Sequence, residues 1–546
     1  MRCKYFIFCL VFLISYQVQS QNVVFTRQDT LRGSITPERA WWDLIYYHLD
    51  VTVKPSDSTI IGTNTVTYKV LKPSRIMQID LQEPMSLTQA TQNNKVLKMR
   101  REGNVYWIEL SDNQEQGKIY SVVFTYGGRP RVSTRPPWVG GITWSKDSKG
   151  LPFVASACQG DGASLWWPCK DHMYDEPDSM LISVNVPENL IDVSNGRLRS
   201  VVQQKNKTKT YNWFVSNPIS NYGVNINIGD YVHFSEVFKG EKGPLDCDYW
   251  VLRENLEKAK EQFKQAPMML AAFEHWYGPY PFYEDSYKLV EAPYLGMEHQ
   301  SSITYGNGFK NGYRGTDLSS SGWGLKFDFI IVHESGHEWF ANNITYEDIA
   351  DMWIHESFTN YAESLYVEYY FGKEAGSEYV LGTRSRIVND KPITGIYNVN
   401  NEGSGDMYYK GGNMLHTLRQ IVNDDEKWRG ILRGLNKDFY HLVVKGSQIE
   451  NYLSEKTGIN LKPFFNQYLR DVRIPVFEYF VKGNELSFRW NDCVPGFDMP
   501  LRIFVSGKPM NITPTTRINT IKLDVENAVI KIDPEYYAGS LNVTGK

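Results

Sequence analysis

Short runs of alternating hydrophobic and polar residues fill the chain between Tyr46 and about Val232. Residues 47–53 and 120–126 are examples, and Gly, Asn, Asp and Pro separate the runs. This alternation is typical of strands that have one buried and one exposed face. The pattern predicts a β-rich N-terminal domain over residues 21–235.

A helical period replaces the alternation after Leu252. Helix-forming residues dominate 252–276, and hydrophobic positions recur every three or four residues in four more segments, at 325–342, 347–371, 412–423 and 447–471. Gly372 directly follows one of these segments and predicts the end of a helix there. We therefore predict a mixed α/β domain over residues 236–473.

Alternation returns beyond Ile474. It marks four strand-length runs, at 477–481, 485–490, 501–505 and 518–524. These runs predict a small β-sandwich over residues 474–546. Since a single hydrophobic core rarely serves so long a chain, we expect a multidomain α+β protein.

The first residues have the composition of a secretory signal. Arg2 and Lys4 precede an apolar stretch from Tyr5 to Ile14, and Ser20 offers a small residue for cleavage. We predict a signal peptide over residues 1–20 and an exported protein, periplasmic or extracellular, either free or surface-associated. An uncleaved anchor is the alternative, but the apolar run is shorter than the ~20 residues that span a bilayer, and no later stretch is long and apolar enough.

Composition excludes few function classes. The 546 residues are 42% hydrophobic and 22% charged, with a formal charge of −4, as in an ordinary soluble globular protein. The absence of a basic bias argues against a nucleic-acid partner. Removing the signal leaves four cysteines: Cys158, Cys169, Cys247 and Cys493. They form one or two isolated disulfides or remain buried thiols. Cys158–Cys169 is the best single candidate pair.

Two histidines four positions apart are the main chemical signal. His333 and His337 are separated by just over one helical turn, so both imidazoles project from one helix face and can bind one ion. Glu334 follows the first histidine, in the position that the general base takes in zinc proteases. The spacing predicts one Zn²⁺ site per chain.

A tetrahedral zinc that keeps one open position needs a third protein ligand. Glu356 follows His337 by 19 positions, a spacing that lets the chain finish one helix, turn and return alongside it. Glu363 lies two helical turns further along the same face, where it can accept a hydrogen bond from a zinc-bound histidine. We therefore predict Glu356 as the third ligand and Glu363 as the hydrogen-bond partner of a zinc-bound histidine.

At these residues the chain resembles the aminopeptidase N family of gluzincin zinc metallopeptidases, which includes leukotriene-type epoxide hydrolases. The resemblance rests on the two histidines, the distant glutamate and the aromatic pair Trp339–Phe340, and it extends over nearly the whole mature chain. It implies a thermolysin-like catalytic domain. Family members commonly end in a large helical domain, whereas only β-segments follow residue 474 here. We expect no C-terminal helical domain and a more open cleft, unless a partner subunit covers it; the oligomeric state stays open.

The resemblance also implies a substrate-binding strand. Residues 295–299 read Leu-Gly-Met-Glu-His where the family carries Gly-x-Met-Glu-Asn on an edge strand beside the zinc. Glu298 is implied to bind the ammonium group of a peptide with a free N-terminus, with Gly296 and Met297 beside it. The first and last residues of the segment depart from the family pattern.

Two more residues receive roles in the same way. Residues 406–412 resemble the Tyr-x-Lys-Gly segment of the family, which implies that Tyr408, or Tyr409 in the other register, donates a hydrogen bond to the tetrahedral intermediate. Residues 157–171 resemble the loop through which the N-terminal domain reaches the site. Gln159 is thereby implied to lie near the ammonium pocket.

The expected activity is removal of N-terminal residues from peptides by promoted-water hydrolysis, with Glu334 as the base. A zinc endopeptidase or epoxide hydrolase on the same site is one alternative. A zinc-containing binding protein without catalysis is the other, but binding alone needs neither Glu334 nor Tyr408.

Overall fold

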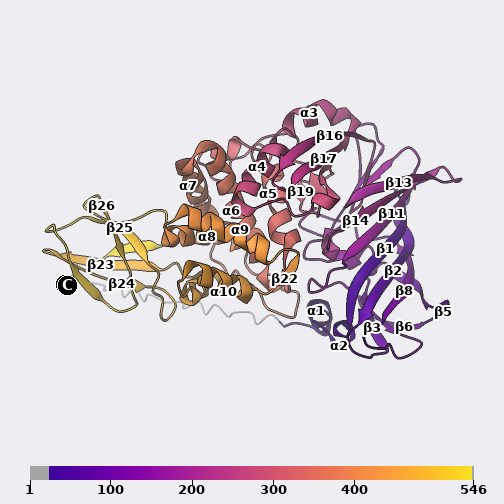
Figure 1. Cartoon of the computed structure of the whole chain (residues 1–546), viewed down its shortest axis with the longest axis horizontal. Coiled ribbons are helices and arrows are strands. Elements are labelled where there is room, and N and C mark those ends of the chain that lie inside the picture. The colour runs from indigo at the N-terminus through magenta and orange to yellow at the C-terminus, as the bar shows by residue number, and fades with distance from the viewer. Residues whose placement is uncertain (1–23, 544–546) are drawn as a thin grey trace, which may run out of the picture.

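The structure, a computed structural model, describes residues 24–543. The predicted signal segment, residues 1–20, lies outside this range. Figure 1 shows an elongated molecule in which the N-terminal strands, the helical middle and the C-terminal strands follow one another along the long axis. Within the described range, every helix is too short or too polar to cross a membrane.

The N-terminal domain is built around an eight-stranded sheet with the order β13-β14-β11-β1-β2-β8-β4-β5. Neighbouring strands run antiparallel except β1 and β11, which are parallel. Buried and exposed residues alternate along β1, as the pattern predicts. In chain order the strands are β1 (Trp42–Lys54), β2 (Thr59–Val70), β4 (Ser86–Gln92), β5 (Lys95–Val96), β8 (Ile119–Gly128), β11 (Ser179–Pro187), β13 (Arg197–Gln203) and β14 (Thr208–Val215).

Two smaller sheets and two short helices complete this domain. The helices α1 (Arg27–Gly33) and α2 (Pro37–Ala40) precede the first strand, and the alternation pattern did not predict them. A capping box between Thr26 and Asp29 starts α1. The smaller sheets consist of β3 (Ile76–Asp80), β6 (Lys98–Glu102) and β7 (Val105–Glu109), and of β9 (Gly141–Lys146), β10 (Pro152–Ala157), β12 (Ile191–Val193) and β15 (Asn227–Gly229).

The middle domain begins with a five-stranded sheet of order β16-β17-β18-β20-β19. The expected boundary at 235/236 falls inside β16, which pairs with β17 along its whole length. The strand β19 lies at the edge of the sheet, antiparallel to β20. The strands are β16 (Tyr231–Gly240), β17 (Gly243–Leu252), β18 (Tyr287–Glu291), β19 (Gly296–Met297) and β20 (Ile303–Tyr305), and a separate pair joins β21 (Ile344–Tyr346) to β22 (Leu442–Val444).

Helices fill the rest of the middle domain, and α6 runs through its centre (Figure 1). Every residue of α6 from Trp353 to Val367 is buried. It ends before Gly372, whose φ of 96° suits glycine, as the sequence predicts. The helices are α3 (Leu256–Gln262), α4 (Gln265–Tyr277), α5 (Phe329–Gly336), α6 (Trp353–Phe371), α7 (Lys373–Gly382), α8 (Tyr409–Val422), α9 (Asp425–Asp438), α10 (Gly446–Thr457) and α11 (Lys462–Arg470).

Several predicted helix boundaries are wrong for local reasons. The segment 325–342 contains only α5 as α-helix. Asp328 accepts hydrogen bonds from Ile330 N and Ile331 N and caps its start, and the backbone beyond its end is non-helical at Phe340 and Ala341. The segment 447–471 is two helices, because the first ends at Gly458 in the left-handed region. The segment 252–276 also divides, into α3 and α4. The segment 347–371 becomes α-helical only at Trp353, and α8 begins at Tyr409, earlier than predicted.

The C-terminal domain contains two β-sheets, as expected for a β-sandwich. One has the order β27-β24-β23-β29 and the other β26-β25-β28. Beyond α11 the described residues form strands and loops only. The strands are β23 (Val476–Lys482), β24 (Glu485–Asn491), β25 (Leu501–Val505), β26 (Lys508–Ile512), β27 (Asn519–Lys522), β28 (Ile530–Ile532) and β29 (Gly539–Asn542).

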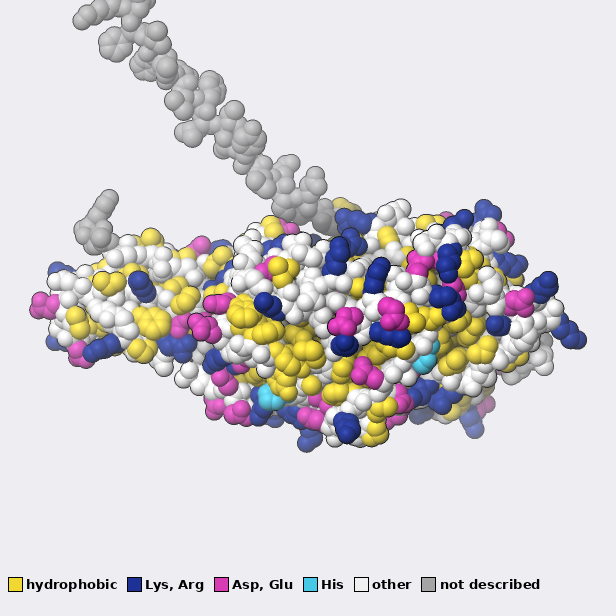
Figure 2. All heavy atoms as spheres, turned by 90° about the horizontal axis from the view of Figure 1, so that it is seen from above, with side chains coloured by type: hydrophobic (Ala, Val, Ile, Leu, Met, Phe, Trp, Pro, Cys, Tyr) yellow, Lys and Arg dark blue, Asp and Glu magenta, His cyan; other side chains and the backbone are white. Residues whose placement is uncertain are grey.

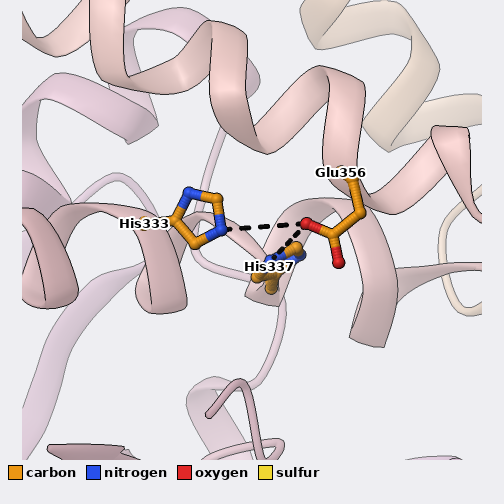
Figure 3. Close-up of side chains that lie close together, drawn as sticks. All are labelled: His333, His337 and Glu356. Atoms are coloured by element: carbon orange, nitrogen blue, oxygen red, sulfur yellow. Dashed lines mark ion pairs between the residues drawn. The ribbon is translucent and has the colours of Figure 1, made fainter. Parts of the chain in front are cut away.

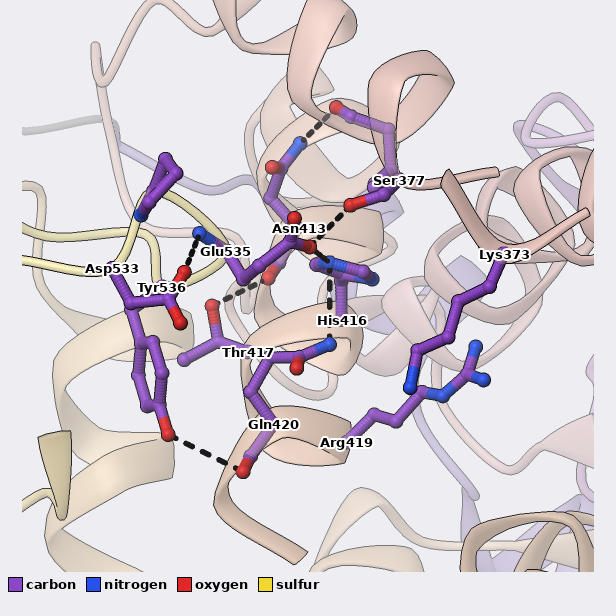
Figure 4. Close-up of polar contacts among 12 residues, drawn as sticks. Lys373, Ser377, Asn413, His416, Thr417, Arg419, Gln420, Asp533, Glu535 and Tyr536 are labelled. Carbon is purple, nitrogen blue, oxygen red and sulfur yellow. Dashed lines mark hydrogen bonds and ion pairs between the residues drawn. The ribbon is translucent and has the colours of Figure 1, made fainter. Parts of the chain in front are cut away.

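A polar seam joins this domain to the helices of the middle domain (Figure 4). His416 of α8 is buried, and its Nε2 lies 2.5 Å from Glu535 Oε2. Ser377 of α7 donates a hydrogen bond to the same carboxylate, and the hydroxyl of Tyr536 donates to the backbone oxygen of Gln420 at 3.2 Å. Around this seam, one continuous hydrophobic core runs from α4 and α6 into the C-terminal strands.

The expected Cys158–Cys169 disulfide is not formed. All four cysteines in the described range are free thiols. Cys158 and Cys169 are fully buried in the core of the N-terminal domain, and burial raises the pKa of the Cys169 thiol well above its usual value. These cysteines act as small apolar core residues.

The surface carries no single dominant charge on the face shown in Figure 2. Basic and acidic side chains are intermixed there, and hydrophobic ones gather along the middle. This mixture agrees with the small formal charge of the chain.

Candidate active site

Helix α5 presents both histidines to one side. His333 lies in its last turn and His337 is its C-cap, still with helical φ and ψ of −64° and −16°. The imidazole centroids are 5.0 Å apart with planes nearly perpendicular. Both residues are buried. The four-residue spacing therefore brings the rings together as predicted.

Glu356, from the first turn of α6, completes the cluster (Figure 3). Its Oε2 lies 3.7 Å from His333 Nε2 and 3.4 Å from His337 Nε2. That oxygen is buried and, within residues 24–543, has no hydrogen-bond partner. Because an orphaned buried carboxylate oxygen is costly, the arrangement fits a cation held by two imidazole nitrogens and one carboxylate, a donor set that suits Zn²⁺.

Behind the two histidines, hydrogen bonds fix their orientation. Glu363 Oε1 lies 2.8 Å from His333 Nδ1, the contact predicted from its spacing in α6. Tyr379 of α7 donates its hydroxyl to Glu363 Oε2 at 2.7 Å. His337 Nδ1 lies 3.1 Å from the carbonyl oxygen of Phe340. These bonds leave Nε2 of both rings to face a metal.

Glu334 lines the cleft from α5, next to the edge strand β19. Gly296 of that strand approaches it closely: a Cβ added there would lie 3.1 Å from Glu334 Cγ and 2.6 Å from Ile330 Cγ2. Only glycine permits this approach. Burial raises the pKa of Glu334 to about 7, with Glu298 adding to the rise and His333 opposing it.

Glu298 adjoins the same cluster, and its ligand atom is within 4.8 Å of those of Glu334 and His337. Gln159 donates from Nε2 to Glu298 Oε1 at 2.6 Å and to Glu356 Oε1 at 3.2 Å. The hydroxyl of Tyr222 donates to the same Oε1 of Glu298 at 3.1 Å. Because both of these contacts end on Oε1, the other oxygen is available to a ligand.

Tyr408 and Tyr409 both line the cleft. Tyr408 stacks near His333, with 6.0 Å between ring centroids. Burial and then the carboxylate of Glu356 raise the pKa of Tyr408 well above its usual value, so its hydroxyl keeps its proton. Tyr409 begins α8 on the side of Glu363. The register expected from the sequence therefore places Tyr408 beside the cluster.

The two departures from the family strand pattern leave the strand in place. Met297 pairs with Thr304 in β20, so the edge-strand geometry is kept. Leu295 lines the cleft with its neighbours. His299 is buried, with its Nδ1 3.4 Å from Thr304 Oγ1, and is not among the residues that line the cleft.

The cleft has a volume of about 470 Å³, within the usual range for a small-ligand site. Its walls also include residues that sequence reasoning missed, from separate segments: Trp138, Tyr313, Asn360, Arg386 and Glu402. No motif identifies them. Sequence reasoning also missed Tyr222, which lies in a short helical turn of the N-terminal domain and contacts Glu298. Only the folded chain shows that these residues share one site.

A family model matches the central part of the chain. Residues 262–468 match the peptidase family M1 domain. The chain is 23% identical over 392 residues to probable aminopeptidase 1 of Sulfurisphaera tokodaii, covering 67% of this chain and 48% of that protein. It is 22% identical over 421 residues to endoplasmic reticulum aminopeptidase 1 of Rattus norvegicus, covering 72% and 44%. It thus spans about half the length of these curated relatives.

Solved structures show the same fold. The M1 zinc metallopeptidase from Deinococcus radiodurans superposes with a TM-score of 0.65 at 20% identity, covering 77% of this chain and 91% of that one. A mutant M1 zinc metallopeptidase from the same organism, bound to a Tyr-Ser-Ala substrate, gives a TM-score of 0.66 at 19% identity, covering 80% and 96%.

Proposed function

Because this chain belongs to the aminopeptidase N family of zinc metallopeptidases, peptidase family M1, we propose that it removes N-terminal residues from peptides by zinc-dependent hydrolysis. The observation that carries the proposal is the orphaned Oε2 of Glu356 facing two imidazole nitrogens, with the Glu298–Gln159 pair beside it. Together they support a cation site next to a site for a substrate ammonium group.

His333, His337 and Glu356 would hold the metal. Zinc bound there supplies Lewis-acid polarisation of the scissile carbonyl group and activation of water. Burial alone would raise the pKa of Glu356, but His337 and His333 hold it below its usual value, so the carboxylate is charged and ready to bind a cation.

Glu334 acts as the proton carrier of the reaction. Its carboxylate takes a proton from the attacking water and later delivers it to the leaving amine. A pKa near 7 suits both transfers. Tyr408, whose raised pKa keeps its hydroxyl protonated, donates a hydrogen bond to the oxygen that gains charge in the transition state.

Glu298 and Gln159 recognise the substrate's N-terminus. A charged carboxylate oxygen in a buried site forms a strong hydrogen bond with an ammonium group, and the Gln159 side-chain oxygen offers a second acceptor. Because these groups adjoin the metal ligands, a peptide anchored there presents its first peptide bond to Glu334.

The basic and apolar N-terminal residues support a further part of the proposal, namely export. Arg2 and Lys4, followed by the apolar residues 5–14, support a signal peptide cleaved after Ser20. The aminopeptidase would then meet peptides outside the cytoplasm.

The first test compares aminoacyl fluorogenic amides with their N-acetylated copies, with and without a zinc chelator. We expect hydrolysis of the free-amine substrates only, lost on chelation and restored by added Zn²⁺. Glu298→Gln lowers kcat/KM for free-amine substrates by about tenfold or more, because one charge-assisted hydrogen bond is worth that much.

Other outcomes point to the alternatives. Cleavage of acetylated substrates at equal rates indicates an endopeptidase. Turnover of an epoxide without amide cleavage indicates an epoxide hydrolase, and inactivity on both with zinc bound indicates a binding protein. Full activity of Glu298→Gln on free-amine substrates contradicts the ammonium role.

A further inference from the structure

The charges that line the cleft are strongly asymmetric. Five carboxylates line it, from Glu298, Glu334, Glu356, Glu363 and Glu402. Among the lining residues that the structure describes, Arg386 is the single lysine or arginine. Neither the metal cluster nor the ammonium pocket uses it.

Arg386 lies in the segment after α7, with part of its side chain fixed and part free. Its Nε donates to the carbonyl oxygen of Leu318 at 2.6 Å, and its guanidinium carbon lies 6.0 Å from the ring centroid of Tyr409. Within residues 24–543, its two terminal nitrogens donate no hydrogen bond and form no ion pair with a carboxylate. By contrast, both terminal nitrogens of Arg384 donate to backbone oxygens in the 534–535 turn.

Arg386 and Glu298 both line the cleft but contact different residues of its wall. Glu298 lies beside His337 and Glu334. Arg386 packs on Tyr409, and burial raises the pKa of Tyr409 to about 12, with Glu363 adding to the rise and Arg386 opposing it. Glu363 is the carboxylate behind His333. The cleft therefore has a negative pole at Glu298 for an ammonium group and one positive side chain, which packs on Tyr409.

We propose that Arg386 binds a carboxylate in the part of the peptide that leaves after cleavage, a proposal that rests on the aminopeptidase function. A peptide with its ammonium group at Glu298 extends across the cluster toward Tyr409. The terminal nitrogens of a guanidinium group match the two oxygens of a carboxylate, and the bond from Nε to Leu318 holds the fork in place. The substrates are short peptides with a free C-terminus, or peptides that carry an acidic side chain just beyond the cleaved bond.

The test uses three matched peptide pairs that share a neutral first residue. The first pair is a tripeptide of Leu-Ala-Ala as free acid and as C-terminal amide. The second and third are the amides Leu-Asp-Ala and Leu-Ala-Asp, each against its Asn counterpart. Each ratio of kcat/KM is measured within one protein preparation, so a change in the folded fraction cancels.

Because Arg386 is exposed and its charge is screened by solvent, we expect the wild-type enzyme to favour the carboxylate member of at least one pair by about two- to fivefold. The first pair reports the C-terminal carboxylate, and the other two report an acidic side chain at either position. Arg386→Gln brings the favoured ratio close to one. Arg386→Lys keeps the positive charge but lacks the two parallel N–H donors of a guanidinium group, so it gives an intermediate ratio. Added salt lowers the wild-type ratio.

Arg199→Gln is the matched control, since Arg199 is an exposed arginine on β13 that stacks on Phe214 and does not line the cleft. It should retain the wild-type ratios. Equal ratios in wild type and Arg386→Gln, or no carboxylate preference in any pair, would overturn the proposal while cleavage of the amides leaves the aminopeptidase function standing. Failure to cleave any peptide would reject both.

Discussion

The carboxylates of this site differ in pKa because their surroundings differ. Glu356 faces two imidazole nitrogens, and its pKa is held low although it is buried. Glu334 lies near the carboxylates of Glu298 and Glu356, and burial raises its pKa to about 7. Pairs of titratable groups whose pKa values are pushed apart divide the work of binding and proton transfer.

Glu334→Gln tests this division of roles. The amide keeps the shape of the side chain but accepts no proton, so we expect kcat/KM to fall by about 10²-fold or more while zinc content stays at one per chain. Steady-state kinetics and metal analysis of one preparation measure both. Glu374→Gln, at an exposed position on α7, is the control and should match wild type. Loss of zinc from Glu334→Gln would instead make it a ligand.

Residues within one regular pattern could be predicted from sequence. The spacing of His333 and His337 follows from helix geometry, and the 19-residue spacing to Glu356 suits a return along a second helix; the structure brings the three together. Tyr222 and Arg386 could not be found in this way. They come from irregular segments far apart in the chain, and their place beside the cleft depends on how whole domains pack.

Among the elements, α7 shows why some helices escape sequence analysis. It contains Gly376 and Gly382, which weaken helix propensity. A Cβ at Gly376 would lie 2.8 Å from the carbonyl oxygen of Ser364, so the glycine permits close packing on α6. The sequence analysis also missed α9, although it buries Trp428, Ile431, Leu432 and Leu435 at helical spacing.

The contact of α7 with the metal site is open to measurement. Tyr379→Phe removes the hydroxyl that donates to Glu363. We expect zinc affinity to fall by about tenfold, because the partners of metal-binding histidines tune affinity by roughly 10- to 100-fold. Competition with a chromogenic chelator measures the change.

Tyr370→Phe serves as the control, since its hydroxyl donates to the backbone of Met268 instead. Equal zinc affinity in Tyr379→Phe and wild type would show that α7 supports the fold and not the metal.

At the scale of the whole molecule, the three-part order of β-rich, mixed and β-rich regions follows from the sequence because each period persists over long stretches. The contacts between these parts could not be predicted from the sequence. The contact between His416 and Glu535 joins residues 119 positions apart, and no local pattern marks either one.

The seam predicts how stability depends on pH. Burial holds the pKa of His416 below 6.5. Burial alone would raise the pKa of Glu535, yet the hydrogen bond from His416 holds it below 4.5. Both groups bind more protons when unfolded, so the free energy of unfolding falls as pH drops, below about 6.5 for His416 and below about 4.5 for Glu535, by about 1.4 kcal/mol for each unit of pKa shift.

Urea unfolding of the zinc-free protein at neutral pH and at two acidic pH values measures this loss without interference from metal release. The double variant His416→Gln, Glu535→Gln should show a flatter dependence on pH. Charges nearby, on Arg384, Arg419, Arg502 and Asp533, are unchanged by the substitutions. Identical slopes in variant and wild type would exclude the seam as the source.

The side chain of Gln159 reaches across from the N-terminal domain and bonds to both Glu298 and Glu356. Under the proposed function, recognition of the peptide N-terminus is thus shared between two domains. In evolution, a metal-binding domain that exchanged its N-terminal partner would inherit the hydrolytic chemistry without this selectivity. Descendants of such an exchange would have to acquire a new binding site for the peptide N-terminus or become endopeptidases. We therefore expect the two domains to be inherited together.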